Sequence, residues 1–223
     1  MPARATPALK QLPELLEFLK MTSALFWGPD LETCRKMRAP DYFTSLDRLA
    51  ARLDPLPRDV QARLKGHVKG FADAHALCNQ LEEEYIPLFV NARGGIAAPL
   101  YQSCYPAPDA PREAASLMGA PAERMQARLT GRELGLANGL NEPPDHLAVE
   151  IEYLYFLIEK GWGQGDADLI AEAADFVKTE MLAWIPRFED RLRAAAPNSF
   201  YTFITMVLVA VLKLSVDVQW SNP

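Results

Sequence analysis

The sequence is poor in the residues that build metal centres and disulfide frameworks. Its 223 residues include only three histidines and three cysteines, at positions 34, 78 and 104. No Cys-x-x-Cys pair occurs, which excludes a zinc ribbon and a thioredoxin-type site and argues against a disulfide scaffold. We therefore expect each cysteine to be a small apolar side chain in a protein from a reducing compartment.

The chain also lacks an excess of positive charge. Lys and Arg together number 23 against 29 Asp and Glu, which gives a formal net charge of -6. A general nucleic-acid binder needs a basic face that displaces counterions from phosphates. The composition therefore predicts no nucleic-acid partner. Hydrophobic residues at 49% and charged residues at 23% lie in the globular range, and the length suffices for a sizeable core.

No apolar run is long enough to cross a membrane. The most apolar stretch, residues 200–212, is well short of the roughly 20 residues that a bilayer requires, so a buried core helix is the better interpretation. Near the N-terminus, Glu14, Glu17 and Lys20 interrupt the apolar positions that a secretory signal would need. The sequence predicts a cytoplasmic protein without stable membrane insertion.

What the sequence does contain is helical periodicity. Apolar residues recur every three or four positions, and no convincing strand alternation is present. Glycine and proline are too dense between residues 94 and 120 for a continuous helix. We predict an all-α bundle of about nine to ten helices in two halves, residues 1–93 and 121–223, joined by a long connecting loop at 94–120. The connection is long enough to exchange halves between protomers, so a monomer and a domain-swapped dimer are both expected states.

Four helices are expected in the C-terminal half, over residues 121–137, 144–160, 166–185 and 199–220. Pro144 suits the first turn of the second helix, and Gly161 is expected as the residue that ends it. Upstream, Pro87 should break or restart a helix near residues 85–89.

Motifs of known catalytic and cofactor sites are absent. The sequence has no phosphate-binding glycine loop, no dinucleotide fingerprint, no zinc-protease motif and no serine-hydrolase elbow. His67 and His75 lie two helical turns apart, too distant to share a metal ion without further ligands. We predict no catalytic residue, no metal and no cofactor.

One loop concentrates polar groups at the start of an apolar helix. It consists of Glu142, Pro143, Pro144, Asp145 and His146. The prolines stiffen the approach, and the positive end of the helix dipole favours a carboxylate there. His146 and Glu150 are four residues apart and should be neighbours on one face. The residues alone leave three interpretations open: a structural cap, a ligand or peptide site, and a metal or acid–base site.

A second segment combines acidic and aromatic residues. Three glutamates precede Tyr85, Leu88 and Phe89, and a later stretch contains Tyr101, Ser103 and Tyr105. This pattern is typical of a helix end followed by a packed loop. It also fits an aromatic wall beside acidic groups, and both interpretations stay open.

Together these segments resemble the TorD/DmsD/NarJ family of cytoplasmic chaperones for molybdenum redox enzymes. Four motifs of that family occur in order: Tyr-x-x-Leu-Phe, Pro-x-Tyr-x-Ser-x-Tyr, Glu-Pro-x-Asp-His-Leu, and Trp-x-Pro-x-Phe followed by Phe-Tyr. Here they are carried by Tyr85, Leu88, Phe89, Pro99, Tyr101, Ser103, Tyr105, Glu142, Pro143, Asp145, His146, Leu147, Trp184, Pro186, Phe188, Phe200 and Tyr201. The chain departs from the pattern at residues 179–181, where the family often has a His, and at Gly131, where it often has a Tyr. These departures concern the subfamily and hence the client.

The resemblance implies a chaperone without catalytic turnover. Such proteins bind the twin-arginine signal peptide, or the apo form, of a molybdopterin-dependent oxidoreductase catalytic subunit, assist cofactor insertion and prevent premature export. The expected peptide-binding residues are Glu142, Pro143, Asp145, His146, Glu150, Tyr85, Leu88, Phe89, Tyr101, Ser103 and Tyr105. Two alternatives are a permanent accessory subunit of a redox complex and a metal-dependent helical enzyme.

The physical chemistry of the expected ligand agrees with this composition. A twin-arginine signal joins a basic segment to an apolar, helix-forming one, so its receptor should combine carboxylates with an apolar, aromatic groove. A net negative charge would also raise the rate of encounter with a basic peptide.

Overall fold

The structure is a computed structural model that describes residues 13–51, 58–106, 117–135 and 142–217. Within these ranges it contains ten α-helices and no β-strand, so the all-α prediction is confirmed. The first five helices are α1 (Pro13–Trp27), α2 (Leu31–Arg38), α3 (Pro40–Ala50), α4 (Arg58–Lys69) and α5 (Ala74–Tyr85). The others are α6 (Ala120–Gly131), α7 (Leu147–Gln164), α8 (Ala167–Phe176), α9 (Leu182–Ala195) and α10 (Phe200–Asp217).

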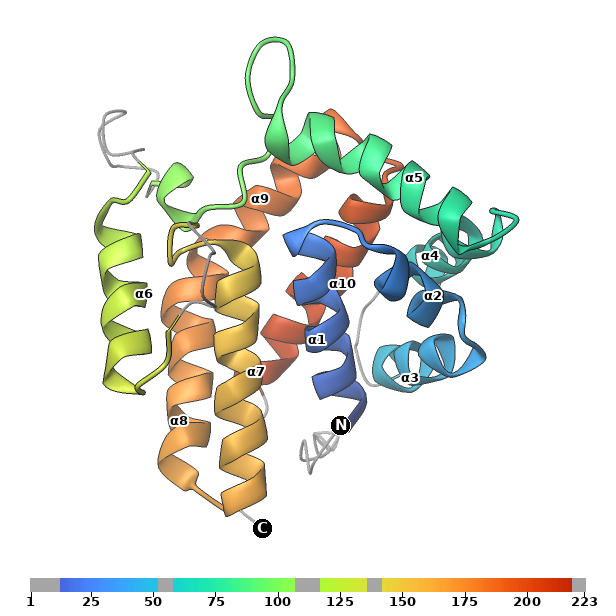
Figure 1. Cartoon of the computed structure of the whole chain (residues 1–223). Coiled ribbons are helices and arrows are strands. Elements are labelled where there is room, and N and C mark those ends of the chain that lie inside the picture. The colour runs from blue at the N-terminus through green and yellow to red at the C-terminus, as the bar shows by residue number, and fades with distance from the viewer. Residues whose placement is uncertain (1–12, 52–57, 107–116, 136–141, 218–223) are drawn as a thin grey trace, which may run out of the picture.

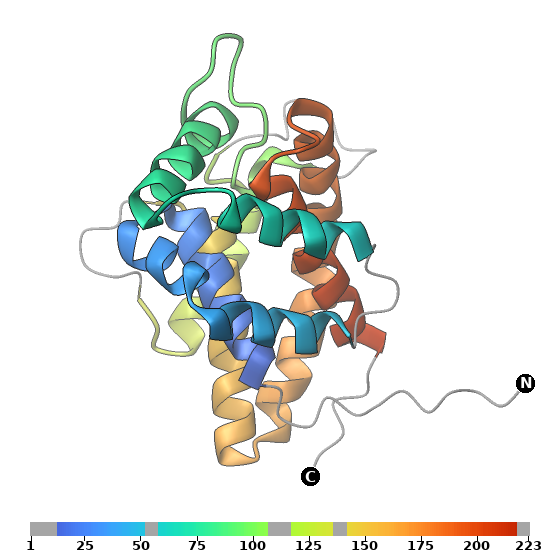
Figure 2. The ribbon, with the colours of Figure 1, turned by 90° about the vertical axis from the view of Figure 1, so that its right-hand side faces the viewer.

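The helices from the two ends of the sequence pack on one another. In Figure 1, α7 lies between α1 and α8, and α6 lies beyond α8. The view in Figure 2 shows α10 beside α4, and α10 also packs against α9 and α5. α2 packs on α5, and α3 packs on α1. The division into two sequence halves and the domain-swapped dimer both stay predictions.

The core forms where these helices meet. α10 is apolar on nearly all sides, and its side chains from Phe200 to Val207 are buried except for Met206, which is only partly exposed. This confirms that residues 200–212 belong to a core helix. No helix in the described ranges has the combination of length and apolarity that a membrane span requires.

Two single turns of π-helix occur near prolines, one at the end of α5 and one between α8 and α9. One spans Ile86–Val90 and contains Pro87, and the other spans Val177–Met181, five residues before Pro186. Proline cannot donate the main-chain hydrogen bond of an ordinary helical turn, and π turns recur at functional sites. The break predicted near residues 85–89 is therefore a change of helical pitch, and the helix expected at 166–185 continues through the second π turn to Ala195.

Three predicted helix ends are wrong, two of them in α7 for local reasons. α7 begins only after His146, because the His146 Nδ1 atom accepts a hydrogen bond from the Ala148 amide and caps the helix; Pro144 therefore lies outside the first turn. At the other end, Gly161 lies inside the helix, and the left-handed residue that closes it is Gly165, with a φ of 66°. The helix expected at 121–137 ends at Gly131, and residues 136 and 137 lie outside the described ranges.

The connection between the halves is partly packed into the core. It first forms a loop that projects from the top of the molecule in Figures 1 and 2. The chain then returns, burying Ala98 and Leu100, and forms a short 3-10 turn at Gln102–Cys104. Its burial explains why this segment can position functional side chains.

Candidate functional site

Two of the predicted motif segments meet directly. The Gln102 amide donates to the Asp145 carbonyl at 3.0 Å, and the Leu147 amide donates to the Leu100 carbonyl at 2.8 Å. Tyr101 and His146 form an isolated antiparallel bridge between these contacts. We call this pairing of residues 99–105 with residues 142–147 the loop junction. It brings together side chains that are about forty positions apart in the sequence.

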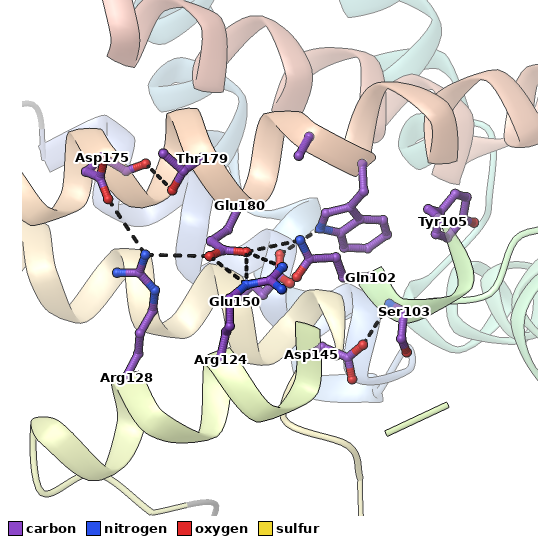
Figure 3. Close-up of polar contacts among 12 residues, drawn as sticks. Gln102, Ser103, Tyr105, Arg124, Arg128, Asp145, Glu150, Asp175, Thr179 and Glu180 are labelled. Atoms are coloured by element: carbon purple, nitrogen blue, oxygen red, sulfur yellow. Dashed lines mark hydrogen bonds and ion pairs between the residues drawn. The ribbon is translucent and has the colours of Figure 1, made fainter. Parts of the chain in front are cut away.

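Asp145 fixes the loop junction from inside. Its side chain is fully buried, and one carboxylate oxygen, Oδ2, accepts a hydrogen bond from the Ser103 amide at 2.8 Å (Figure 3). The other oxygen, Oδ1, and the Ser103 hydroxyl have no hydrogen-bond partner. Buried carboxylates of this kind are costly unless bonded, so the Ser103 contact is central to the geometry of the junction.

His146 turns its ring toward α1. The imidazole stacks on the Trp27 indole with ring centres 4.7 Å apart and an angle of 10° between the planes, and the Tyr101 ring meets its edge at 5.2 Å. Burial lowers the pKa of His146 to about 4, although the nearby Glu142 and Asp145 carboxylates act in the opposite direction. The ring is therefore neutral at physiological pH, which agrees with its Nδ1 atom accepting from Ala148.

Trp27 belongs to none of the sequence motifs and was not predicted as a site residue. Its Nε1 donates to the Glu152 carboxylate at 2.7 Å, and the Ser23 hydroxyl donates to the same oxygen at 2.8 Å. These contacts fix α1 to α7 and hold the indole over His146. The link depends on residues about 125 positions apart, which local sequence patterns do not reveal.

The outer edge of the junction carries Glu142 and Pro143, both partly exposed. The Tyr101 hydroxyl donates to Glu142 Oε2 at 2.7 Å. Burial, followed by this contact with an acidic group, raises the pKa of Tyr101 above its usual value. This edge presents a carboxylate beside an aromatic ring, and its binding of a basic ligand stays a prediction.

Glu150 does not share a site with His146, although the two are four residues apart. Its side chain is 1% exposed, and its Oε2 atom accepts from the Trp184 indole at 2.9 Å. Burial raises the pKa of Glu150 well above its usual range, and the Oε1 atom has no hydrogen-bond partner. The side chains of His146 and Glu150, which were predicted to be neighbours, therefore lie in different surroundings, because α7 is buried on more than one side.

The remaining predicted residues lie in an aromatic core cluster. Phe89 packs against Tyr85 at 5.0 Å and against Tyr201 at 5.1 Å, and Tyr105 packs against Trp184 at 5.2 Å. Leu88, Phe89 and Tyr105 are at most 5% exposed. The aromatic residues of the motifs thus lie in the core, where Tyr105 anchors the loop junction to Trp184. Their direct contact with a peptide stays a prediction.

A row of arginines on α6 and at its C-terminal cap faces a row of carboxylates on α8 and the second π turn. Arg124 donates through Nε and Nη2 to Glu180 at 3.0–3.2 Å, and Arg132 pairs with Glu172. Arg128 lies between them, 3.6 Å from Glu180 and 3.7 Å from Asp175 (Figure 3). It also lies 3.9 Å from Glu172. We call these six residues the charge ladder. The spacing of four along α6 was visible in the sequence, but its long-range partners were not.

Gln102 joins the charge ladder to the loop junction. Its side-chain amide donates to Glu180 Oε2 at 3.2 Å, while its main chain belongs to the junction. Burial acts to raise the pKa of Glu180, but the hydrogen bonds from Arg124 and Gln102 and the two arginine charges outweigh it, and the pKa is lowered. Glu180 is therefore an ionised carboxylate at the meeting point of both regions.

An apolar cleft of about 650 Å³ lies between α6 and the loop junction. It is lined by Met118, by Pro144 and by residues of α6, namely Ala122, Glu123, Gln126, Ala127, Thr130 and Gly131. Met118 is 61% exposed and holds a φ of 62°, which is strained for a residue with a long side chain. The only side chain of the Pro-Asp-His loop that lines this cleft is Pro144.

The described residues contain no group of three His, Cys, Asp or Glu side chains placed to hold a metal ion. The three cysteines are free thiols; Cys34 is buried, and Cys78 and Cys104 are partly buried.

Comparison with known proteins gives consistent matches. The family model described as nitrate reductase delta subunit matches residues 52–190, more than half of the chain. The protein named chaperone TorD from Aliivibrio fischeri is 29% identical over 154 residues, covering 67% of each chain. The one from Vibrio vulnificus is 30% identical over 142 residues, covering 62% of this chain and 63% of its own. The one from Vibrio parahaemolyticus is 28% identical over 106 residues, covering 46% and 49%.

The chain thus spans between about half and two thirds of the length of these curated relatives. Among solved structures, a proposed redox enzyme maturation protein from Archaeoglobus fulgidus superposes with a TM-score of 0.43 at 21% identity. That alignment covers 86% of this chain and 98% of the other.

Proposed function

The chain belongs to the nitrate reductase delta subunit family, and from that premise we propose that it is a maturation chaperone for a molybdopterin-dependent oxidoreductase. It binds the twin-arginine signal peptide, or the apo form, of the catalytic subunit in the cytoplasm. By holding this segment it assists cofactor insertion and delays export. The chaperone itself converts no substrate.

The observation that carries this proposal is the direct joining of the two motif segments beside an apolar cleft. The loop junction is fixed by buried hydrogen bonds, and Pro144 of the same loop lines the cleft. A rigid polar edge next to an apolar cavity suits a ligand with a basic part and an apolar part.

The properties of the cleft fit the apolar part of such a leader. Its α6 wall consists of small or flexible side chains with one carboxylate, Glu123, so a helix can approach closely. Met118 offers an adaptable apolar surface. A strained residue at the edge of a cavity supports a role in ligand binding. The partly exposed Glu142 supplies a negative charge nearby.

The cleft can be tested by filling it. Ala127 is exposed on α6, so Ala127→Trp should occupy the cleft without disturbing the core. We expect this variant to bind a synthetic peptide with two adjacent arginines and an apolar, helix-forming stretch at least about tenfold more weakly, a loss of about 1.4 kcal/mol, in titration calorimetry. Ala194→Trp, at an exposed position of α9, is the matched control and should bind as the wild type does.

Wild-type affinity in the Ala127→Trp variant, with unchanged circular dichroism, would exclude the cleft as the peptide site. Absence of binding by the wild-type protein would exclude leader recognition altogether. A pull-down from cells that express candidate leaders would identify the client.

The family description itself favours a second candidate, a permanent subunit of a redox complex. That role predicts stoichiometric co-purification with the mature, cofactor-loaded enzyme. A chaperone should instead co-purify with the immature catalytic subunit and be absent from the mature complex.

A further inference from the structure

The charge ladder contains more arginine–carboxylate pairing than α6 needs to stay attached. α6 already buries Ala122, Met125 and Leu129 against the rest of the molecule. The arginines lie on one side of this buried stripe, and the cleft lies on the other. Burial of the apolar stripe alone can hold the helix in place, so the ladder is available for another role.

The arginines of the ladder are accessible to water. The side chains of Arg124, Arg128 and Arg132 are 50%, 23% and 36% exposed. Exposed arginine–carboxylate pairs contribute little net stability, because water competes for both partners. These arginine side chains can therefore rotate outward without movement of α6. The Glu180 side chain is only 10% exposed, so it must be paired again by an incoming cation when Arg124 leaves.

Glu150 offers a buried acceptor atom that has no hydrogen-bond partner. Glu150 lies beside Arg124 and Glu180 in Figure 3, with its Oε1 atom buried and without a hydrogen-bond partner. The Trp184 indole already occupies the other oxygen. Arg124 directs its Nε and Nη2 donors to Glu180, so the structure leaves Glu150 Oε1 unsatisfied.

We propose that the carboxylate face formed by Glu172, Asp175 and Glu180, with Glu150 behind it, receives the arginines of a client leader. In the unliganded chain, Arg124 and Arg128 of α6 occupy this face as an internal substitute. Exchange of one guanidinium for another preserves the ion pairs, and a ligand arginine can also reach Glu150 Oε1 through its remaining donors. This inference rests on the proposed function, since it assigns the surface that binds the basic part of the same ligand.

The positions of the two surfaces limit the path of the leader. Ala122 on the cleft side and Arg124 on the ladder side both lie in the first two turns of α6. A leader that reaches both surfaces therefore crosses about one helix width, roughly 10 Å, at the start of α6.

The test removes the internal competitor. Arg124→Gln combined with Arg128→Gln should bind the twin-arginine peptide about three- to tenfold more tightly than the wild type, because fewer protein arginines compete for Glu180. The matched control is Arg63→Gln with Arg193→Gln. It removes the same charge from two arginines on α4 and α9 whose side chains are 50% and 49% exposed, and should change the affinity less than twofold. Circular dichroism checks that both proteins fold.

The receiving face is tested from the opposite side. Glu172→Gln with Asp175→Asn should weaken binding of the same peptide about tenfold. A peptide with two lysines in place of the arginines should gain little from Arg124→Gln with Arg128→Gln, because lysine cannot contact Glu180 and Glu150 together with a planar fork. If the double arginine variant does not fold, the single variants are expected to bind two- to threefold more tightly.

Each outcome decides a different claim. Unchanged or weaker binding by the folded arginine variants, with normal wild-type binding, overturns the assignment of the ladder and leaves the cleft proposal intact. An equal gain in the Arg63 and Arg193 control shows a general charge effect and also overturns it. If no variant and no wild-type protein binds the peptide, leader recognition fails first, and this inference fails with it.

Discussion

The loop junction and the charge ladder share Gln102 but are built from opposite kinds of contact. The junction consists of main-chain hydrogen bonds, a fully buried Asp145 and a stacked, neutral His146. The ladder consists of long, partly exposed arginine side chains on carboxylates. Buried hydrogen bonds are costly to break, whereas exposed ion pairs exchange with water at little cost. The comparison indicates that the motif residues form a rigid frame and that the adjustable part of the site lies outside the motifs.

The largest expected effect concerns the frame. Asp145→Ala removes the acceptor of the buried Ser103 amide, so we expect the free energy of unfolding to fall by about 2–3 kcal/mol. Urea denaturation measures this loss. Asp145→Asn, which keeps an acceptor oxygen, should recover part of it, and the exposed Asp190→Ala should change stability by less than about 0.5 kcal/mol. A negligible loss in Asp145→Ala would show that the junction is not rigid.

A smaller effect should appear as a pH dependence of stability. Burial lowers the pKa of His146 from 6.5 to about 4. Between these values the unfolded chain binds a proton on His146 that the folded chain does not bind, so stability falls as the pH drops through this window. Through this group alone, the free energy of unfolding should fall by about 1.4 kcal/mol between pH 7.5 and 5.5.

His146→Asn isolates this effect, because asparagine can still cap α7 but does not titrate. The variant should lose stability less steeply than the wild type over that pH range in chemical denaturation. His75→Gln, at an exposed position of α5, should keep the wild-type slope. Equal slopes for wild type and His146→Asn would contradict the assignment of a buried, neutral imidazole.

The smallest effect is expected in the ladder. Arg132→Gln removes a partly exposed pair with Glu172 and should lower stability by less than about 1 kcal/mol. The difference from wild type should shrink further in 1 M salt, where screening acts over roughly 3 Å. A loss as large as that of Asp145→Ala, and independent of salt, would mean that the ladder belongs to the rigid frame.

The sequence predicted the fold class because apolar spacing reports helices directly. It misplaced the start of α7, because Pro144 satisfies a first-turn rule while the His146 side chain actually caps the helix. It also placed the helix end at Gly161. This residue instead lies inside α7, where it packs closely against Ile170 of α8. A glycine can mark either a helix end or a close approach between helices, and the sequence does not distinguish the two.

The candidate site was predictable only as separate pieces. The motif resemblance selected both segments of the loop junction, but the hydrogen bonds between residues 100–103 and 145–147 depend on the tertiary fold. Trp27, Glu180 and the cleft were missed for the same reason. The four-residue spacing of Arg124, Arg128 and Arg132 was a usable signal, although helical spacing alone does not name the partners of a charged row.

The burial of α10 against α4 has a consequence for how the molecule folds. His67 on α4 contacts the carbonyl of Asn198, 131 residues later, in the turn just before α10. Contacts with such a large sequence separation raise the contact order and slow folding. During synthesis, the N-terminal helices must wait for α10 before their apolar faces are covered. A newly made chain therefore passes through a period in which it is itself vulnerable to aggregation.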